Sequence, residues 1–173
     1  KEDAIDLPKI EGYINYENVS FSYIEGIEVL KDINIKVKPK QRVAFVGFTG
    51  AGKTTLISLL SRFYDPTKGR ITIDGHDIRD IKLESLKKHL GIVLQDTFLF
   101  SGTIKDNIKY GRLDATDEEI IEAAKSVGAH KFIMKLPNGY ETDVMERGQL
   151  LSIGQRQLIS FARALLADPP ILI

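Results

Sequence analysis

The sequence predicts an α/β fold, and three patterns of apolar residues support this prediction. Residues 43–46 form a continuous apolar run, which is typical of a strand that is covered on both faces. A glycine-rich loop follows this run, and Leu56, Leu59 and Leu60 then recur at helical spacing. Residues 33–37 alternate between apolar and polar side chains, as in a half-buried strand. Strands and amphipathic helices are therefore expected to share one core.

The bulk composition allows one domain with a hydrophobic core. The chain has 173 residues, of which 43% are hydrophobic, and the absence of cysteine excludes disulfides and thiolate metal sites. The 24 basic and 24 acidic residues cancel, so the overall charge gives no indication of nucleic-acid binding. No apolar run approaches the roughly 18 residues that a membrane-spanning helix needs. We therefore expect a soluble chain that acts at a membrane only through a partner or another part of the polypeptide.

The first half of the chain should be rich in strands. Apolar residues recur at about period two within residues 13–23, and again at Ile71 and Ile73 before the hairpin turn signal Asp74-Gly75. Phe63 is expected to continue the apolar face of the helix that follows the glycine-rich loop. Residues 83–90 favour a short helix, and residues 91–94 favour another buried strand.

The part after residue 95 should be mostly helical. Thr116 and Glu119 form a capping-box pattern ahead of an apolar helical face, and Gly128 is the expected end of that helix. Ser152 and Gln155 repeat the pattern. The helix that they open has its expected apolar positions at Leu158, Phe161, Ala162 and Leu165. The prolines at 169 and 170 should end this helix, and residues 171–173 should begin a strand.

Residues 47–54 (GFTGAGKT) match the phosphate-binding pattern GxxxxGK[ST], between an expected strand and an expected helix. Glycines let backbone N–H groups approach phosphate oxygens, and the helix start adds unsatisfied donors. Lys53 supplies a charge to the β- and γ-phosphates, and the Thr54 hydroxyl can bind Mg²⁺. The strand–loop–helix context disfavours the alternative, a turn that binds nothing. The nucleotide-binding candidates here are Gly47, Thr49, Gly50, Ala51, Gly52, Lys53, Thr54 and Thr55.

Three further features resemble ATP-binding cassette (ABC) proteins. Residues 151–157 (LSIGQRQ) resemble the LSGGQ signature of that family, and Gln95 stands where the family has its Q-loop glutamine. Tyr23 precedes the phosphate loop at the distance where the family places a ring that stacks on adenine. The resemblance implies ATP and Mg²⁺ as cofactors. It implies Lys53 and Gln95 as catalytic residues, and Thr54 and Gln95 at the metal. It also implies that Ser152, Gly154 and Gln155 face the ATP of an opposing cassette.

Residues 95–108 (QDTFLFSGTIKDNI) resemble the segment that follows the Q-loop in exporters of drugs, lipids and peptides, and residues 136–142 and 146–148 fit the same pattern. The resemblance implies a P-loop NTPase (RecA-like) core with an antiparallel β-subdomain and an α-helical subdomain at about residues 97–151. Residues 1–10 would be a linker, and residues 11–173 a partial, C-terminally incomplete nucleotide-binding domain. The implied partners are a second nucleotide-binding domain, in a head-to-tail homo- or heterodimer, and the transmembrane domains of an exporter, with no nucleic acid. The implied location is the cytoplasmic face of a membrane.

The chain departs from the family pattern at a few positions. Phe48 lies at a variable site, Met145 stands where exporters usually have glycine, and Ile153 replaces the first signature glycine. Ile153 would either hinder the approach of the backbone to phosphate or pack against the helical subdomain. The Mg²⁺-shell aspartate and the water-polarising glutamate of the family follow the strand that residues 171–173 begin. Residues 1–173 alone are therefore expected to be defective in hydrolysis. Two alternatives stay open: a soluble cassette ATPase of chromosome maintenance or translation, and a non-catalytic nucleotide-binding fragment.

Overall fold

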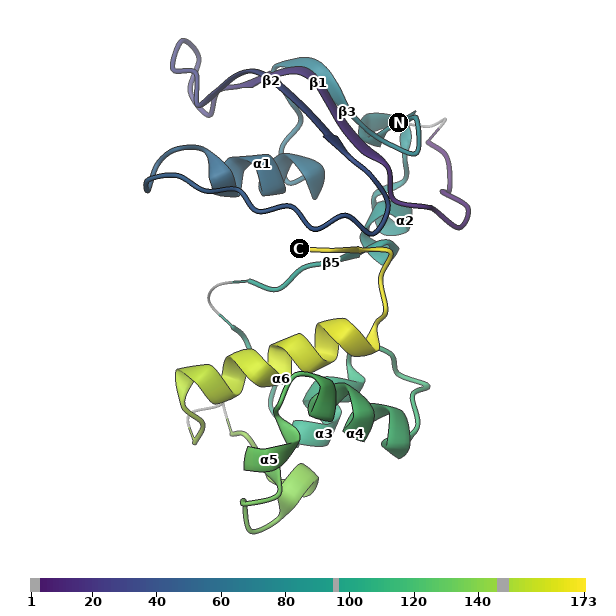
Figure 1. The fold of residues 1–173 in the computed structure, drawn as a ribbon, viewed down its shortest axis with the longest axis vertical. Coiled ribbons are helices and arrows are strands. Elements are labelled where there is room, and N and C mark those ends of the chain that lie inside the picture. The colour runs from purple at the N-terminus through teal and green to yellow at the C-terminus, as the bar shows by residue number, and fades with distance from the viewer. Residues whose placement is uncertain (1–3, 95–96, 146–149) are drawn as a thin grey trace. The chain divides into compact units, whose positions relative to one another are not determined.

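The computed structural model describes residues 4–94, 97–145 and 150–173, which form two compact units. The N-terminal unit covers Lys1–Leu90, and the C-terminal unit covers Gly91–Ile173. An antiparallel sheet dominates the first unit and helices dominate the second (Figure 1), as the sequence predicts. None of the helices in the described ranges is long and apolar enough to cross a membrane.

The sheet of the N-terminal unit has four strands in the order β2-β1-β3-β4, and every neighbouring pair is antiparallel. The strands are β1 (Ile14–Phe21), β2 (Leu30–Val37), β3 (Lys68–Ile73) and β4 (His76–Asp77). Asp74 and Gly75, with φ angles of 49° and 84°, connect β3 to β4. A tight hairpin of this kind needs positive φ at both central positions, which Asp-Gly tolerates. The hairpin turn predicted from these two residues is confirmed.

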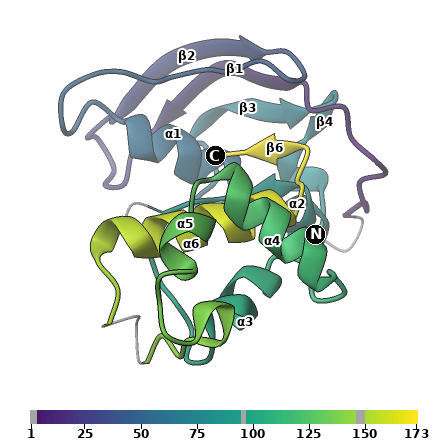
Figure 2. The ribbon, with the colours of Figure 1, turned by 60° about the horizontal axis from the view of Figure 1, so that its bottom comes forward.

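Helix α1 (Lys53–Leu60) lies along one face of this sheet (Figure 1; Figure 2). It buries Leu56, Leu59 and Leu60, and each such leucine stabilises the fold by about 1.5–3 kcal/mol. From β1, the Tyr16 hydroxyl donates a hydrogen bond to the Leu56 carbonyl at 3.0 Å, and burial raises the pKa of Tyr16. Phe63 does not continue the apolar face, because the helix ends at Leu60 and the chain turns away, which leaves Phe63 62% exposed.

Residues 43–46, which lead into the phosphate loop, do not form the predicted buried strand. They have no regular secondary structure, and the side chains of Val43 and Val46 are 44% and 91% exposed. A strand that is covered on both faces needs neighbouring strands to pair with it. Within the described N-terminal unit, the sheet consists of β1 to β4 alone and gives this segment no partner. The apolar run identifies a segment suited to burial, but its pairing depends on the surroundings.

The N-terminal segment is packed along its described part, from residue 4 onward. Ile5 forms a parallel bridge with Ile81, just after the 3₁₀ helix η1 (Ile78–Asp80), and Leu7 and Ile10 are buried. The backbone N–H of Leu7 donates to Ser85 Oγ at 2.8 Å in helix α2 (Leu83–Lys88), the short helix expected there. That residues 1–10 act as a linker stays a prediction, and their described part is held against η1 and α2.

The C-terminal unit is a cluster of helices around one core (Figure 2). Its long helix α6 (Ile153–Leu166) packs against α3 (Ile104–Lys109) and α4 (Asp117–Ser126), and buries Ile159, Ala162 and Leu166. The predicted capping boxes at Thr116 and Ser152 are both confirmed. The unit also contains α5 (His130–Ile133) and η2 (Gly139–Glu141).

The predicted apolar face of α6 is only partly correct. Phe161 and Leu165 are 43% and 40% exposed, whereas Ile159 and Leu166 fill the core. Two neighbouring stripes of this helix are apolar, and the helices that cover it decide which stripe is buried.

Two short strands, β5 (Leu90–Gly91) and β6 (Ile171–Leu172), pair with each other. The Ile173 N–H donates to the Gly91 carbonyl and the Val93 N–H donates to the Ile173 carbonyl, each at 2.8 Å. The strand predicted to begin at residues 171–173 is therefore confirmed. The buried strand predicted at residues 91–94 is not, because only Gly91 belongs to a strand and Leu94 is 60% exposed.

Candidate nucleotide-binding site

The phosphate loop enters α1 through glycines that no other residue could replace without strain. Gly50 and Gly52 have φ angles of 87° and 83°, in the left-handed region that disfavours side chains. A Cβ atom at Gly52 would lie 2.7 Å from Cδ2 of Leu30. Gly52 is the N-cap of α1, and no side chain caps this helix. The first N–H groups of α1 are therefore left for a ligand, and its first turn holds no acidic residue to neutralise them.

The Lys53 ammonium lies over the loop that precedes it. Its Nζ atom donates to the carbonyl oxygens of Gly47 and Phe48, at 2.7 Å each. An ammonium has three N–H donors, so this arrangement fixes its position and leaves one donor for a further acceptor. Thr54, the next residue, is exposed, as an Mg²⁺-binding hydroxyl must be. The donors and the hydroxyl at the start of α1 fit a phosphate group with its magnesium ion.

Tyr23 is placed beside α1, in the same unit as the phosphate loop. Its hydroxyl lies 3.1 Å from Thr55 Oγ1, in the first turn of the helix. Its ring meets Phe21 and Tyr64 edge to face, with centroids 4.8 and 5.1 Å apart. Half of the Tyr23 side chain is nevertheless exposed. A ring that is held by two aromatic neighbours and still open to solvent is suited to stack on a flat base.

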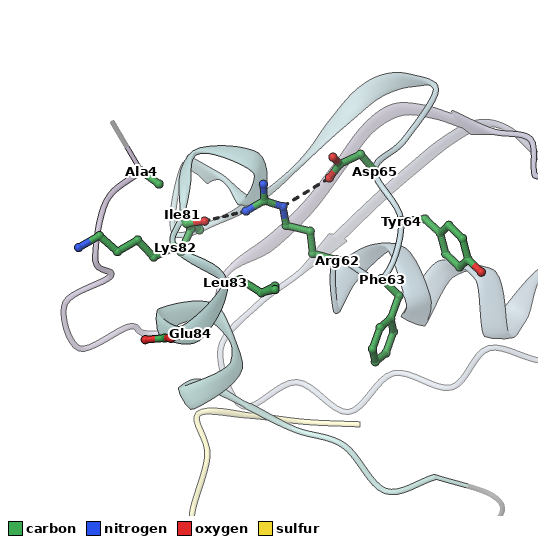
Figure 3. Close-up of a pocket in the computed structure, with 9 residues that line it drawn as sticks. All are labelled: Ala4, Arg62, Phe63, Tyr64, Asp65, Ile81, Lys82, Leu83 and Glu84. Carbon is green, nitrogen blue, oxygen red and sulfur yellow. Dashed lines mark hydrogen bonds and ion pairs between the residues drawn. The ribbon is translucent and has the colours of Figure 1, made fainter. Parts of the chain in front are cut away.

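A cavity of about 670 Å³ lies beyond the C-terminal end of α1 (Figure 3). In its wall, Arg62 Nη1 donates to the Ile81 carbonyl at 2.7 Å, and Arg62 Nε lies 3.4 Å from Asp65 Oδ1. None of the predicted nucleotide-binding residues lines this cavity. Its lining residues are Ala4, Arg62, Phe63, Tyr64, Asp65, Ile81, Lys82, Leu83 and Glu84.

The start of α6 carries the candidates of the C-terminal unit. Ser152 Oγ accepts a hydrogen bond from the Gln155 N–H at 3.2 Å, and Gln155 Oε1 accepts one from the Ser152 N–H at 2.9 Å. Gly154 has open space where a Cβ would lie. Ser152, Gly154 and Gln155 thus share one exposed helix start, where backbone donors and a hydroxyl can face a ligand.

The structure characterises Ile153 and Met145, two of the positions at which the chain departs from the family pattern. Ile153 is 66% exposed and does not belong to the helical core. Met145 has a φ angle of 58°, in the region that favours glycine. A glycine would adopt this conformation without strain, whereas a side chain costs roughly 1–2 kcal/mol there.

Some expectations lie outside the described residues. These are the placement of Gln95, the predicted catalytic and metal-binding glutamine, and that of residues 146–148. In the described ranges, no group of three or more His, Asp or Glu residues could hold a metal ion, and the role of the Thr54 hydroxyl toward Mg²⁺ stays a prediction. Sequence reasoning missed Arg163 and Asn107, which are hydrogen-bonded across the C-terminal unit. No local pattern could have found a pair that is 56 residues apart.

Comparisons with known proteins identify the family. The ABC transporter family model matches residues 30–173. A putative multidrug export ATP-binding/permease protein of Bacillus subtilis, YgaD, is 55% identical over the whole chain, and an ATP-dependent lipid A-core flippase of Syntrophus aciditrophicus is 51% identical. The chain spans 30% and 29% of these relatives. A solved bacterial Atm1-family ABC exporter with ATP bound is 45% identical with a TM-score of 0.95, over 99% of this chain and 30% of that one. This chain belongs to the ABC transporter family.

Proposed function

We propose that this chain is the ATP-binding motor domain of an exporter, in which MgATP binding and hydrolysis drive the transport of a substrate across a membrane. The observation that carries the proposal is the start of α1, where Lys53 is held on two loop carbonyls beside uncapped helix donors. The names of the relatives, which describe multidrug export and lipid flipping, support the exporter class. No observation favours the soluble ATPase of chromosome maintenance or translation.

Each candidate residue has a distinct task in this proposal. The Tyr23 ring stacks on the adenine, and the loop amides from Gly47 to Gly52 together with Thr55 surround the phosphates. Lys53 neutralises the β- and γ-phosphates, and Thr54 with Gln95 holds the magnesium ion. When bound, Mg²⁺ supplies charge compensation for the transferred phosphoryl group.

The second half of the site would come from another cassette. In the proposed head-to-tail dimer, Ser152, Gly154 and Gln155 face the γ-phosphate that is held by the partner cassette. Transmembrane domains, on whose cytoplasmic side the dimer would act, would convert its closure into transport. We further propose that residues 1–173 alone bind nucleotide without hydrolysing it, because the P-loop positions phosphate but activates no water.

The proposal is tested with the complete exporter in lipid nanodiscs. We expect ATP hydrolysis that requires Mg²⁺, and a loss of that activity in Lys53→Ala with no loss in the exposed β2 variant Lys31→Ala. The purified 1–173 chain should bind an ATP analogue and release no phosphate above its own Lys53→Ala control. Equal ATP hydrolysis by the wild type and by Lys53→Ala would contradict the assignment of the phosphate loop.

A further inference from the structure

Asn107, in α3, is the centre of a buried hydrogen-bond cluster in the C-terminal unit, and is 1% exposed. Its side-chain oxygen accepts from the Phe100 backbone N–H at 2.9 Å. Its side-chain nitrogen donates to the carbonyls of Phe100 and Thr103, at 2.9 and 3.0 Å. Buried amides are stable only when their polar atoms are paired. The segment that precedes α3 is therefore fastened to this helix by one side chain.

Arg163 reaches this cluster from α6. Its Nη2 donates to the side-chain oxygen of Asn107 and its Nε to the Asn107 carbonyl, at 2.8 Å each, while Nη1 donates to the Phe98 carbonyl at 3.2 Å. The guanidinium carbon lies 5.2 Å from the centre of the Phe100 ring, within the range of a cation–π contact. One side chain of α6 thus binds both α3 and the segment before it.

All three hydrogen-bond acceptors of Arg163 are neutral. In the described part of the unit, no salt bridge includes Arg163, and burial lowers the pKa of its guanidinium. Its hydrogen bonds and its contact with the Phe100 ring therefore offset the cost of desolvating the cation. It contributes a planar fork of donors at fixed angles, which a lysine with one nitrogen cannot reproduce.

The two segments that Arg163 joins both lead to residues of the proposed ATP sites. Phe98 follows Gln95 by three residues, and Ser152 lies about 16 Å from Arg163 along α6, at 1.5 Å per residue. In the proposed dimer, Gln95 serves the ATP of its own cassette, whereas Ser152 serves the ATP of the opposite one. We propose that Arg163 is a positioning residue that fixes the segment after Gln95 to the signature helix, so that the two ATP sites change together. This inference rests on the proposed function.

The kinetic test compares Arg163→Lys and Arg163→Ala with Arg112→Lys in the complete exporter. Arg112 belongs to the same unit, is partly exposed and pairs with Glu119, so its variant is the matched control. We expect kcat to fall roughly tenfold in both Arg163 variants. The KM for ATP should change by less than about twofold, because the phosphate loop lies in the other unit. The Hill coefficient for ATP should fall toward one.

Methylguanidinium provides the test of the donor fork. At millimolar concentration it should restore part of the kcat of Arg163→Ala and leave Arg163→Lys unchanged. A wild-type kcat in both Arg163 variants would overturn the inference. The inference would also be overturned if kcat fell in proportion to the fraction of unfolded protein and methylguanidinium did not restore it.

Hydrogen exchange tests the contact without relying on catalysis. In Arg163→Lys, the amides of residues 98–103 should exchange roughly tenfold faster than in the wild type, whereas Arg112→Lys should leave them unchanged. Equal exchange in both variants would overturn the inference even if the exporter hydrolyses ATP. An exporter that does not hydrolyse ATP would contradict the proposed function instead. The exchange experiment would still test the Arg163 contact in that case.

Discussion

The starts of α1 and α6 are built in opposite ways. At α1 the N-cap is Gly52, in a left-handed conformation and without a side-chain cap. At α6, Ser152 and Gln155 close a capping box that satisfies donors of the chain itself. A phosphate can supply the acceptors that the first helix start lacks, whereas side chains cap the second. We therefore propose that α1 is the primary phosphate site and that α6 adds contacts to a phosphate held elsewhere.

Removing the charge at α1 should have the largest effect on binding. Lys53→Ala loses a charge-assisted contact worth roughly 1.5–3 kcal/mol, or about 10- to 150-fold in the dissociation constant for MgATP. Isothermal titration measures this dissociation constant. Lys31→Ala, which also removes one lysine, is the control. Unchanged affinity in Lys53→Ala would remove the distinction between the two helix starts.

Removing the cap of α6 should distinguish the effect of Ser152 on fold stability from its effect on ATP turnover. Ser152→Ala and Thr116→Ala each delete the side chain of a capping box and should each destabilise the fold by about 1 kcal/mol. Only Ser152→Ala should also lower ATP turnover in the complete exporter, by roughly tenfold. Thermal unfolding and phosphate release measured on both variants check this. A parallel loss of turnover in Thr116→Ala would mean that the effect arises from helix stability alone.

Ile153 sharpens the comparison, because it places an exposed β-branched side chain at the start of α6. Ile153→Gly should let the backbone approach phosphate more closely. The dissociation constant of the ATP-dependent cassette dimer should then fall by about threefold. Analytical ultracentrifugation with and without ATP measures this, with Leu113→Gly as a control for the loss of an exposed apolar residue in the same unit. Equal dimerisation in Ile153→Gly and the wild type would show that the isoleucine is merely tolerated.

A third helix start, at α3, should respond to pH. Asp106 accepts hydrogen bonds from the Thr103 N–H and hydroxyl, at 2.9 and 2.8 Å, and chiefly the backbone bond lowers the pKa of Asp106. A depressed pKa contributes stability above the ordinary value of about 3.9, and this stability is lost as pH falls through the folded-state pKa. Asp106→Asn should therefore have a lower Tm than the wild type at pH 7, with the difference shrinking below about pH 4. A Tm difference that is constant from pH 7 to pH 2.5, measured against Asp114→Asn, would show that the charge is not involved.

Local signals were predictable from the sequence. The boxes at Thr116 and Ser152 join residues three apart, and the Asp74-Gly75 turn depends on the backbone freedom of those two residues. The phosphate loop belongs to the same class, because its glycines and Lys53 act within eight residues. In each case the chemistry that decides the structure is contained in the motif itself.

Features that depend on distant partners were not predictable. Residues 43–46 have the composition of a buried strand, but no strand of the described N-terminal unit pairs with them. On α6, the packing of α3 and α4 decides that Ile159 rather than Phe161 is buried. The contact of Arg163 with Asn107 crosses 56 residues, and no local rule specifies it. The roles of Gln95 and of the signature residues toward ATP stay predictions.

The central claim is that α1 and α6 contribute to different ATP molecules in one head-to-tail dimer. Retention of ATP by mixed dimers of Lys53→Ala and Ser152→Ala tests it most directly. In such a dimer one site carries both substitutions and the other carries neither. Rapid gel filtration removes ATP that α1 holds alone, so we predict two retained ATP per wild-type dimer, about one per mixed dimer and almost none in either pure variant. A mixed dimer that retains no more ATP than the pure variants would contradict the claim.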